Sequence, residues 1–86
     1  MEYSKYKLVK QLFDKLQYRG LRPKVRVILY NNRKIEGFLY DVKNNYIYVL
    51  KMDGRITFYS YTQVKELEFF GDPVIEKIYK EVMDNI

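Results

Sequence analysis

Apolar side chains recur at every second position through most of residues 24–70, and polar turns interrupt this alternation. A period of two is the pattern of a strand with one buried face. The turns are Asn31-Asn32, Lys43-Asn44-Asn45 and Asp53-Gly54, of which Asp-Gly is a strong hairpin signal. The strands that this pattern predicts are Lys24–Tyr30, Arg33–Val42, Tyr46–Lys51, Arg55–Tyr61 and Val64–Phe70. Short strands joined by tight turns favour a small, strongly bent antiparallel barrel over residues 24–70, because closure removes most of the exposed edge.

A helical period precedes the alternating stretch. Leu8, Leu12 and Leu16 fall on one face of a helix predicted over residues 4–19. Ser4 is its predicted N-cap, and Gly20 stands where a helix-terminating glycine is expected.

A second helical pattern follows the last predicted strand. Asp72 is the predicted N-cap and Pro73 the first residue of a helix over residues 73–85. Its apolar stripe consists of Ile75, Ile78, Tyr79, Val82 and Ile86. The order helix, five strands, helix predicts a mainly β fold with flanking helices. A length of 86 residues suits a single domain spanning residues 1–86.

The composition bears on catalysis, because the chain contains no Cys and no His. It therefore lacks disulfide bonds, a thiol nucleophile, the usual zinc ligands and the histidine of a Ser-His-Asp triad. The only serines, Ser4 and Ser60, have no base nearby, and no two carboxylates have a spacing typical of acid–base catalysis. We therefore expect a binding protein without metal or cofactor, and not an enzyme.

Two further features concern the location of the protein. No apolar run approaches the roughly 18 residues of a membrane-spanning helix. The first residues, MEYSKYK, lack the apolar core of a signal peptide. We therefore expect a cytoplasmic protein that does not interact with membranes.

Positive charge is concentrated in the first half of the chain. The net charge is +5, and residues 1–43 hold eleven Lys and Arg against four Asp and Glu, a net +7. A clustered basic excess attracts polyanions through phosphate contacts and counterion release. Charge alone does not distinguish RNA from DNA or from an acidic protein. The candidate phosphate contacts are Lys7, Lys10, Arg22, Arg26, Arg33 and Lys34.

The stretch VRVILYNNRKIEGFLYDV, residues 25–42, resembles the first motif of the Sm-like proteins, which include archaeal Sm-like proteins and bacterial Hfq. That motif has alternating apolar residues, a polar turn and then an apolar-x-Gly-x-apolar segment, here Ile35, Gly37 and Leu39. YSYTQVKELEF is similar to the shorter second motif, with Val64 and Leu67 in its apolar positions. The resemblance implies an SH3-like small barrel that binds single-stranded RNA. It also implies a ring of six or seven copies, in which the fourth strand of one copy pairs with the fifth strand of the next.

The residues that hold a uracil in this family differ here. The family's Asp and Asn positions are occupied by Lys43 and Ile47, and its Arg-Gly pair by Ser60-Tyr61. The resemblance places the loop after the second strand beside the loop after the fourth. The candidate RNA-binding residues are therefore Lys43, Asn44, Asn45, Ser60 and Tyr61. Asn amides can read a base edge, Tyr can stack on a base and Lys can contact a phosphate. Alternatively, the asparagines only form a turn and Tyr61 fills a subunit contact.

Aromatic residues form a second candidate surface. Those that share one parity in the predicted strands are Phe38, Tyr40, Tyr46, Tyr48, Tyr59 and Tyr61. If exposed, such a face is a stacking platform for unpaired bases. If a terminal helix or a neighbouring copy covers it, it belongs to a core or an interface.

The predicted function is that of an Sm-like, ring-forming protein that binds single-stranded RNA as a scaffold or chaperone. One alternative is an oligomeric protein-interaction or assembly module of the same fold without a base pocket. The other is a small barrel that binds duplex DNA. Preference for one homopolymer RNA would indicate a base pocket, whereas a salt-sensitive affinity indifferent to sequence and strandedness would indicate generic phosphate binding.

Overall fold

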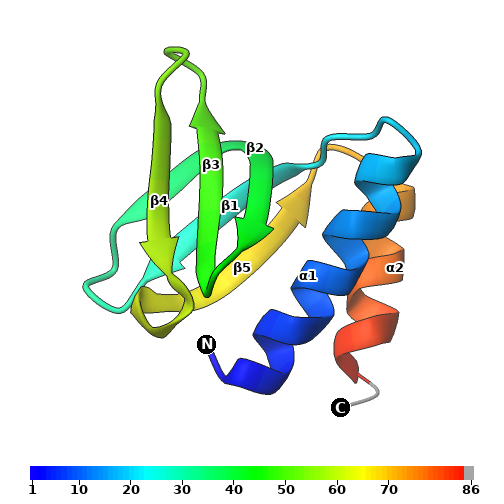
Figure 1. Ribbon diagram of the computed structural model, residues 1–86, viewed down its shortest axis with the longest axis horizontal. Coiled ribbons are helices and arrows are strands. Elements are labelled where there is room, and N and C mark those ends of the chain that lie inside the picture. Colours follow the sequence, from blue (N-terminus) through cyan, green and yellow to red (C-terminus); the bar gives the residue numbers. More distant parts are fainter. Residues whose placement is uncertain (85–86) are drawn as a thin grey trace.

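A helix, five strands and a second helix follow one another in the computed structural model, which describes residues 1–84 (Figure 1). This order confirms the mainly β fold with flanking helices that the sequence predicts. A short 3₁₀ turn, η1, links the last two strands. The elements are α1 (Tyr3–Tyr18), β1 (Lys24–Leu29), β2 (Lys34–Lys43), β3 (Tyr46–Lys51), β4 (Ile56–Ser60), η1 (Tyr61–Gln63), β5 (Val64–Phe70) and α2 (Pro73–Asp84).

The start of α1 differs from the prediction, whereas its end agrees with it. The N-cap is Glu2, whose side chain makes no capping hydrogen bond, and Ser4 lies inside the helix. At the other end Gly20 has a φ of 72°, a left-handed conformation that glycine adopts without strain. Its N–H donates to the carbonyl of Gln17 at 2.9 Å.

The start of α2 agrees with the prediction. A carboxylate oxygen of Asp72 accepts hydrogen bonds from the N–H groups of Val74 at 2.9 Å and Ile75 at 3.3 Å. This is the bonding of an N-cap, with Pro73 as the first helical residue. The sequence also assigns residue 85 to this helix and Ile86 to its apolar stripe, and both positions lie outside the described residues.

The five strands form one antiparallel sheet in the order β4-β3-β2-β1-β5. The sheet is strongly bent, so that β3 and β4 run steeply across the direction of β1 and β5 (Figure 1). Within residues 1–84 no ladder joins β4 to β5, so these two strands are the edges of the sheet. The bent sheet is as expected, but the described pairings do not close it into a barrel.

Both helices pack on one face of the sheet and lie beside each other (Figure 1). The apolar stripe of α1 joins the inward side chains of the strands in one hydrophobic cluster. α2 contributes a single buried residue, Ile75, and packs the ring of Tyr79 against Phe69 at a centroid distance of 4.4 Å. Neither helix of residues 1–84 covers the opposite face of the sheet.

Gly37 allows β2 and β3 to approach closely. A Cβ atom at this position would collide with the carbonyl group of Leu50 on β3. The glycine thus serves a close backbone contact, whereas the irregularity of β2 lies further on, between Leu39 and Asp41. Such a bulge bends the strand and increases its twist.

The helices within residues 1–84 include none that is both long and apolar enough to cross a membrane.

Candidate functional site

The turn between β2 and β3 holds two asparagines in the left-handed region. Asn44 has a φ of 54° and Asn45 a φ of 70°, and Lys43 pairs with Tyr46 across the turn. Two consecutive residues with positive φ make a type I′ hairpin turn, for which asparagine is among the favoured residues. The sequence therefore places two amide side chains side by side at the end of a hairpin.

Two other elements meet this turn. The N–H of Tyr61, at the start of η1, donates to the carbonyl of Asn45 at 3.0 Å. The Tyr61 ring lies against Tyr6 of α1, with 5.2 Å between centroids. The hydroxyl of Tyr6 in turn donates to the carbonyl of Tyr46 at 3.4 Å. Burial raises the pKa of this Tyr6 phenol. The start of α1, the β2–β3 turn and η1 are thus joined at one place.

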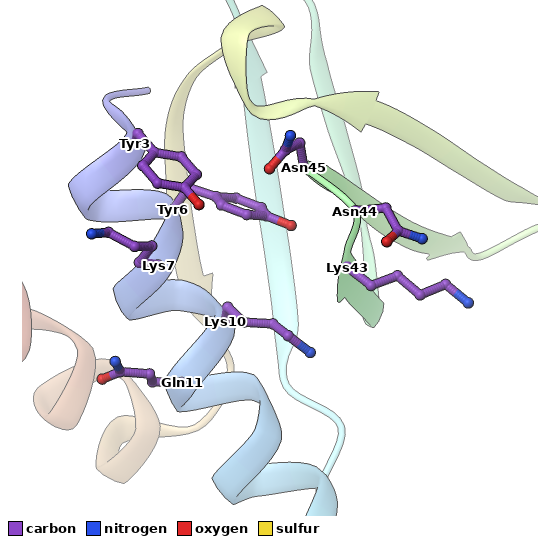
Figure 2. A pocket seen from close by; sticks show the side chains of 8 residues that line it. All are labelled: Tyr3, Tyr6, Lys7, Lys10, Gln11, Lys43, Asn44 and Asn45. Atoms are coloured by element: carbon purple, nitrogen blue, oxygen red, sulfur yellow. The ribbon is translucent and has the colours of Figure 1, made fainter.

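A cleft of about 320 Å³ lies between α1 and this turn (Figure 2). Figure 2 shows the side chain of Tyr6 reaching from the helix toward Asn45, with Lys10 beside the opening. None of the lining residues is acidic. They are Tyr3, Tyr6, Lys7, Lys10, Gln11, Lys43, Asn44 and Asn45.

The three lysines that line the cleft are available to an anion, although Lys43 Nζ also lies 5.7 Å from the centroid of the Tyr48 ring. Lys7 Nζ lies 5.2 Å from the centroid of the Tyr3 ring. Lys10 Nζ is 3.0 Å from Asp14 and Lys43 Nζ is 3.5 Å from Asp41, but these lysine side chains are 40% and 54% exposed. Ion pairs in such positions contribute on the order of 0–1 kcal/mol, so a phosphate can replace the carboxylate. The cleft thus combines cations, amides that both donate and accept, and aromatic rings.

The structure brings together most of the residues that the sequence proposes for RNA binding. Lys43, Asn44 and Asn45 line the cleft, and two of the proposed phosphate contacts, Lys7 and Lys10, line it with them. Tyr61 supports the cleft from behind, through its contacts with Tyr6 and Asn45.

Ser60 has a local role. Its hydroxyl accepts from the N–H of Thr62 at 3.3 Å, and its own N–H donates to the side chain of Gln63 at 3.0 Å. These bonds form a capping box for η1. Ser60 is not among the residues that line the cleft.

The other proposed phosphate contacts lie elsewhere. Arg26 is held between two carboxylates, Glu36 at 2.8 Å and Glu68 at 3.1 Å. Arg33 lies in the β1–β2 turn and Lys34 begins β2. Arg22 follows α1 and places its guanidinium 4.9 Å from the ring of Tyr40.

The predicted aromatic face is wrong for Tyr59 and Tyr61. Tyr59 pairs with buried Ile47, and residues opposite each other in a ladder point to the same face. Tyr61 lies in η1 rather than in a strand, and both tyrosines pack against the core. The face away from the helices instead carries Tyr46, Tyr48 and Phe58, whose rings lie 5.6–6.5 Å apart.

Sequence reasoning missed Tyr3, Tyr6 and Gln11. Helical spacing is the signal that could have found them, because residues three or four apart, such as Tyr3, Lys7 and Lys10, lie on one face of α1. That face carries both polar and aromatic residues, so it did not stand out from a solvated helix face.

No protein-family model, curated protein or solved structure matches this chain. Within the part of the chain that the structure describes, no group of three or more acidic side chains is arranged to hold a metal ion.

Proposed function

We propose that this protein binds single-stranded RNA in the cleft between α1 and the β2–β3 turn. One observation carries the proposal: Lys7, Lys10 and Lys43 come from two separate elements, yet they line one cleft that has no acidic lining residue. A cleft with this charge suits a polyanion.

The other lining residues favour an unpaired strand. Asn44 and Asn45 offer amide groups to a base edge, and the half-exposed ring of Tyr3 offers surface to a base, while buried Tyr6 supports it. In a duplex the base edges are paired and the base faces are stacked on each other, so neither is accessible to these side chains. The lysines would contact the phosphates that flank a bound base.

We further propose that the chain is an Sm-like protein and assembles into a ring of six or seven copies. Three features support this: an N-terminal helix, a strongly bent five-stranded sheet, and unpaired edges at β4 and β5. On β4, Ile56 is 49% and Phe58 57% exposed. Pairing β4 of one copy with β5 of the next would cover both edges, which otherwise favour aggregation.

RNA titration of matched variants tests the binding site. Fluorescence anisotropy would follow a labelled, uridine-rich RNA of about 12 nucleotides, a length within the usual range of single-strand sites. We expect Lys7→Gln with Lys43→Gln to weaken binding at least about ten-fold. It should also lower the slope of log affinity against log salt by about 1.4, since each single-strand phosphate contact adds about 0.7.

The control removes the same charge elsewhere. The double variant Arg33→Gln with Lys34→Gln removes two positive charges at the β1–β2 turn and should weaken RNA binding much less. Equal losses for the two double variants would indicate generic attraction and contradict the cleft. Equal affinity for duplex DNA would favour the small DNA-binding barrel, and no affinity for either nucleic acid would favour the protein-interaction module.

A further inference from the structure

A second cavity, of about 220 Å³, lies at the other end of α1. The loop after α1, the start of β1, the end of β5 and the start of α2 meet there. About 10 Å of helix, from Gln11 to Tyr18, separates it from the proposed RNA-binding cleft, since α1 rises about 1.5 Å per residue. The residues that give it its chemistry are Arg22, Lys24, Phe38, Phe70 and Asp72.

Two aromatic rings flank a lysine in this cavity. In the sheet Lys24 is paired with Phe38 on β2 and with Phe70 on β5. Side chains opposite each other in neighbouring strands share a face, so the three form one row across the sheet. Lys24 Nζ lies 5.9 Å from the centroid of the Phe38 ring. A Cβ at Gly71 would lie 3.3 Å from Lys24 Cδ, so the lysine stem passes close to this glycine.

Arg22 adds a second cation on a fixed segment of chain. The N–H of Leu21 donates to the carbonyl of Leu16 at 2.8 Å, and the N–H of Leu39 donates to the carbonyl of Pro23 at 2.9 Å. The residues on either side of Arg22 are therefore tied to α1 and to β2. These bonds fix the backbone at Arg22, and its side chain lines the cavity with the guanidinium 4.9 Å from the Tyr40 ring.

The charges in this cavity favour an anion. Neither Arg22 nor Lys24 forms a salt bridge with a carboxylate of residues 1–84, whereas Arg26, one row further along β1, forms two. Asp72 is the one acidic lining residue, and one of its carboxylate oxygens already caps the first N–H groups of α2. The two cations thus outnumber the single carboxylate.

We infer that this cavity is a nucleotide-binding site, in which a base lies against Phe38 or Phe70 and a phosphate is bound by Arg22 and Lys24. Rings beside cations suit a ligand that is both planar and anionic, because the ring takes the base and the cation takes the phosphate. A nucleoside monophosphate and one unit of an RNA strand share this chemistry. The inference does not depend on the RNA cleft, since no residue is common to the two linings.

NMR titration of the isotope-labelled protein tests the inference. The probes are AMP, adenosine and inorganic phosphate. We expect AMP to shift the resonances of Lys24, Phe38, Phe70 and Gly71, and to bind at least about ten-fold more tightly than adenosine or phosphate. An AMP titration that leaves these resonances unmoved would overturn the inference. So would inorganic phosphate binding as tightly as AMP, because the cavity would then be a simple anion patch.

Matched variants test the contact with the phosphate and the contact with the base separately. Lys24→Gln should weaken AMP binding about ten-fold, and Phe70→Leu, which keeps an apolar side chain but loses the ring, about five-fold. Lys34→Gln, at the start of β2 and in the lining of neither cavity, should leave AMP affinity unchanged. An unchanged amide spectrum away from the substitution establishes that each variant is folded. If Lys24→Gln and Lys34→Gln have equal effects, the assignment is wrong.

An RNA of about 12 nucleotides distinguishes the two sources of the nucleotide. If the strand reaches the cavity, the RNA shifts the same four residues and competes with AMP. If the site takes free nucleotides, RNA leaves these resonances in place while AMP still shifts them. Both results support the site. If RNA fails to bind at the cleft while AMP binds here, the proposed function fails and this inference stands.

Discussion

At the scale of single residues, the two asparagines of the β2–β3 turn have two separable roles. Their backbones, with φ of 54° and 70°, form the turn, and their amide side chains line the cleft proposed to bind RNA. A left-handed conformation costs a residue with a Cβ roughly 1–2 kcal/mol, although asparagine tolerates it better than most. Glycine would adopt the same turn without this cost, but it has no side-chain amide.

Asn44→Gly with Asn45→Gly should therefore weaken RNA binding without harming the fold. The carbonyl of Asn45 that accepts a hydrogen bond from the Tyr61 N–H belongs to the backbone, so both substitutions leave this bond in place. We expect an unfolding free energy that is unchanged or raised by up to about 1 kcal/mol in urea titrations, and an RNA affinity lowered several-fold. Unchanged RNA affinity would show that the amides do not contact the base.

Tyr79 gives a prediction about alkaline pH. Burial, and then the charges of Glu66 and Glu68, raise the pKa of its phenol from 10.0 to about 12. The folded protein therefore holds this proton more tightly than the unfolded chain. The resulting stabilisation is complete below pH 10 and is lost as the pH rises from about 10 to 12. The loss of unfolding free energy over this range is about 2 kcal/mol.

Tyr79→Phe should remove this part of the pH dependence. Unfolding free energies measured in urea between pH 9 and pH 12 should fall by about 2 kcal/mol less in this variant than in the wild type. Tyr18→Phe is the control, because Tyr18 is 94% exposed. The same pH dependence in both variants would contradict the assigned burial.

At the scale of elements, turn geometry determines which side chains each strand buries. Alternation and turn residues predicted β3 and β5 with their observed bounds, and the other strands to within one residue at either end. They did not predict which face of β4 is buried, because Ile56 and Phe58 are more apolar than Thr57. The tight turn at Asp53-Gly54 pairs Ile56 with Leu50, which directs Thr57 and Tyr59 inward and leaves Phe58 outside.

The bulge in β2 is the second feature that alternation does not reveal. Leu39 pairs with Val49 and Asp41 with Tyr48, so Tyr40 has no direct partner on β3. The successive buried side chains Leu39 and Val42 are therefore three residues apart instead of two. A strict period of two across residues 34–43 assigns the second half of the strand to the wrong face.

α2 provides a prediction about helix docking. Ile75 is its buried residue and is 6% exposed, whereas neighbouring Val74 is 66% exposed. We expect Ile75→Ala to lower the unfolding free energy by about 2–4 kcal/mol in urea titrations. Val74→Ala should change it by less than about 0.5 kcal/mol. Similar losses from both variants would contradict the docking of α2 through Ile75.

At the scale of the whole molecule, the sequence predicted part of the candidate site and missed the rest for a physical reason. Lys43, Asn44 and Asn45 were found because they follow one another in a turn, and Lys7 and Lys10 because they belong to a basic cluster. That these two groups face each other depends on how α1 packs on the sheet. Tyr6 shows this, since its ring contact with Tyr61 joins residues far apart in the chain.

The unpaired edges give a prediction about assembly. Light scattering of nuclease-treated protein should report the mass of six or seven copies, independent of concentration. Phe58→Lys places a charge on the exposed side of β4, where it should disfavour strand pairing between copies and yield a monomer with unchanged circular dichroism. A wild-type monomer or dimer would rule out the ring and leave RNA binding by the single copy to be judged on its own.

Photo-crosslinking tests the RNA cleft most directly. A uridine-rich RNA of about 12 nucleotides that carries 4-thiouridine would be irradiated with the protein, and the crosslinked peptides identified by mass spectrometry. The cleft predicts crosslinks within residues 3–11 and 43–45, which are lost when excess unlabelled RNA competes. Crosslinks confined to β5 and α2, or none at saturating RNA, would contradict it.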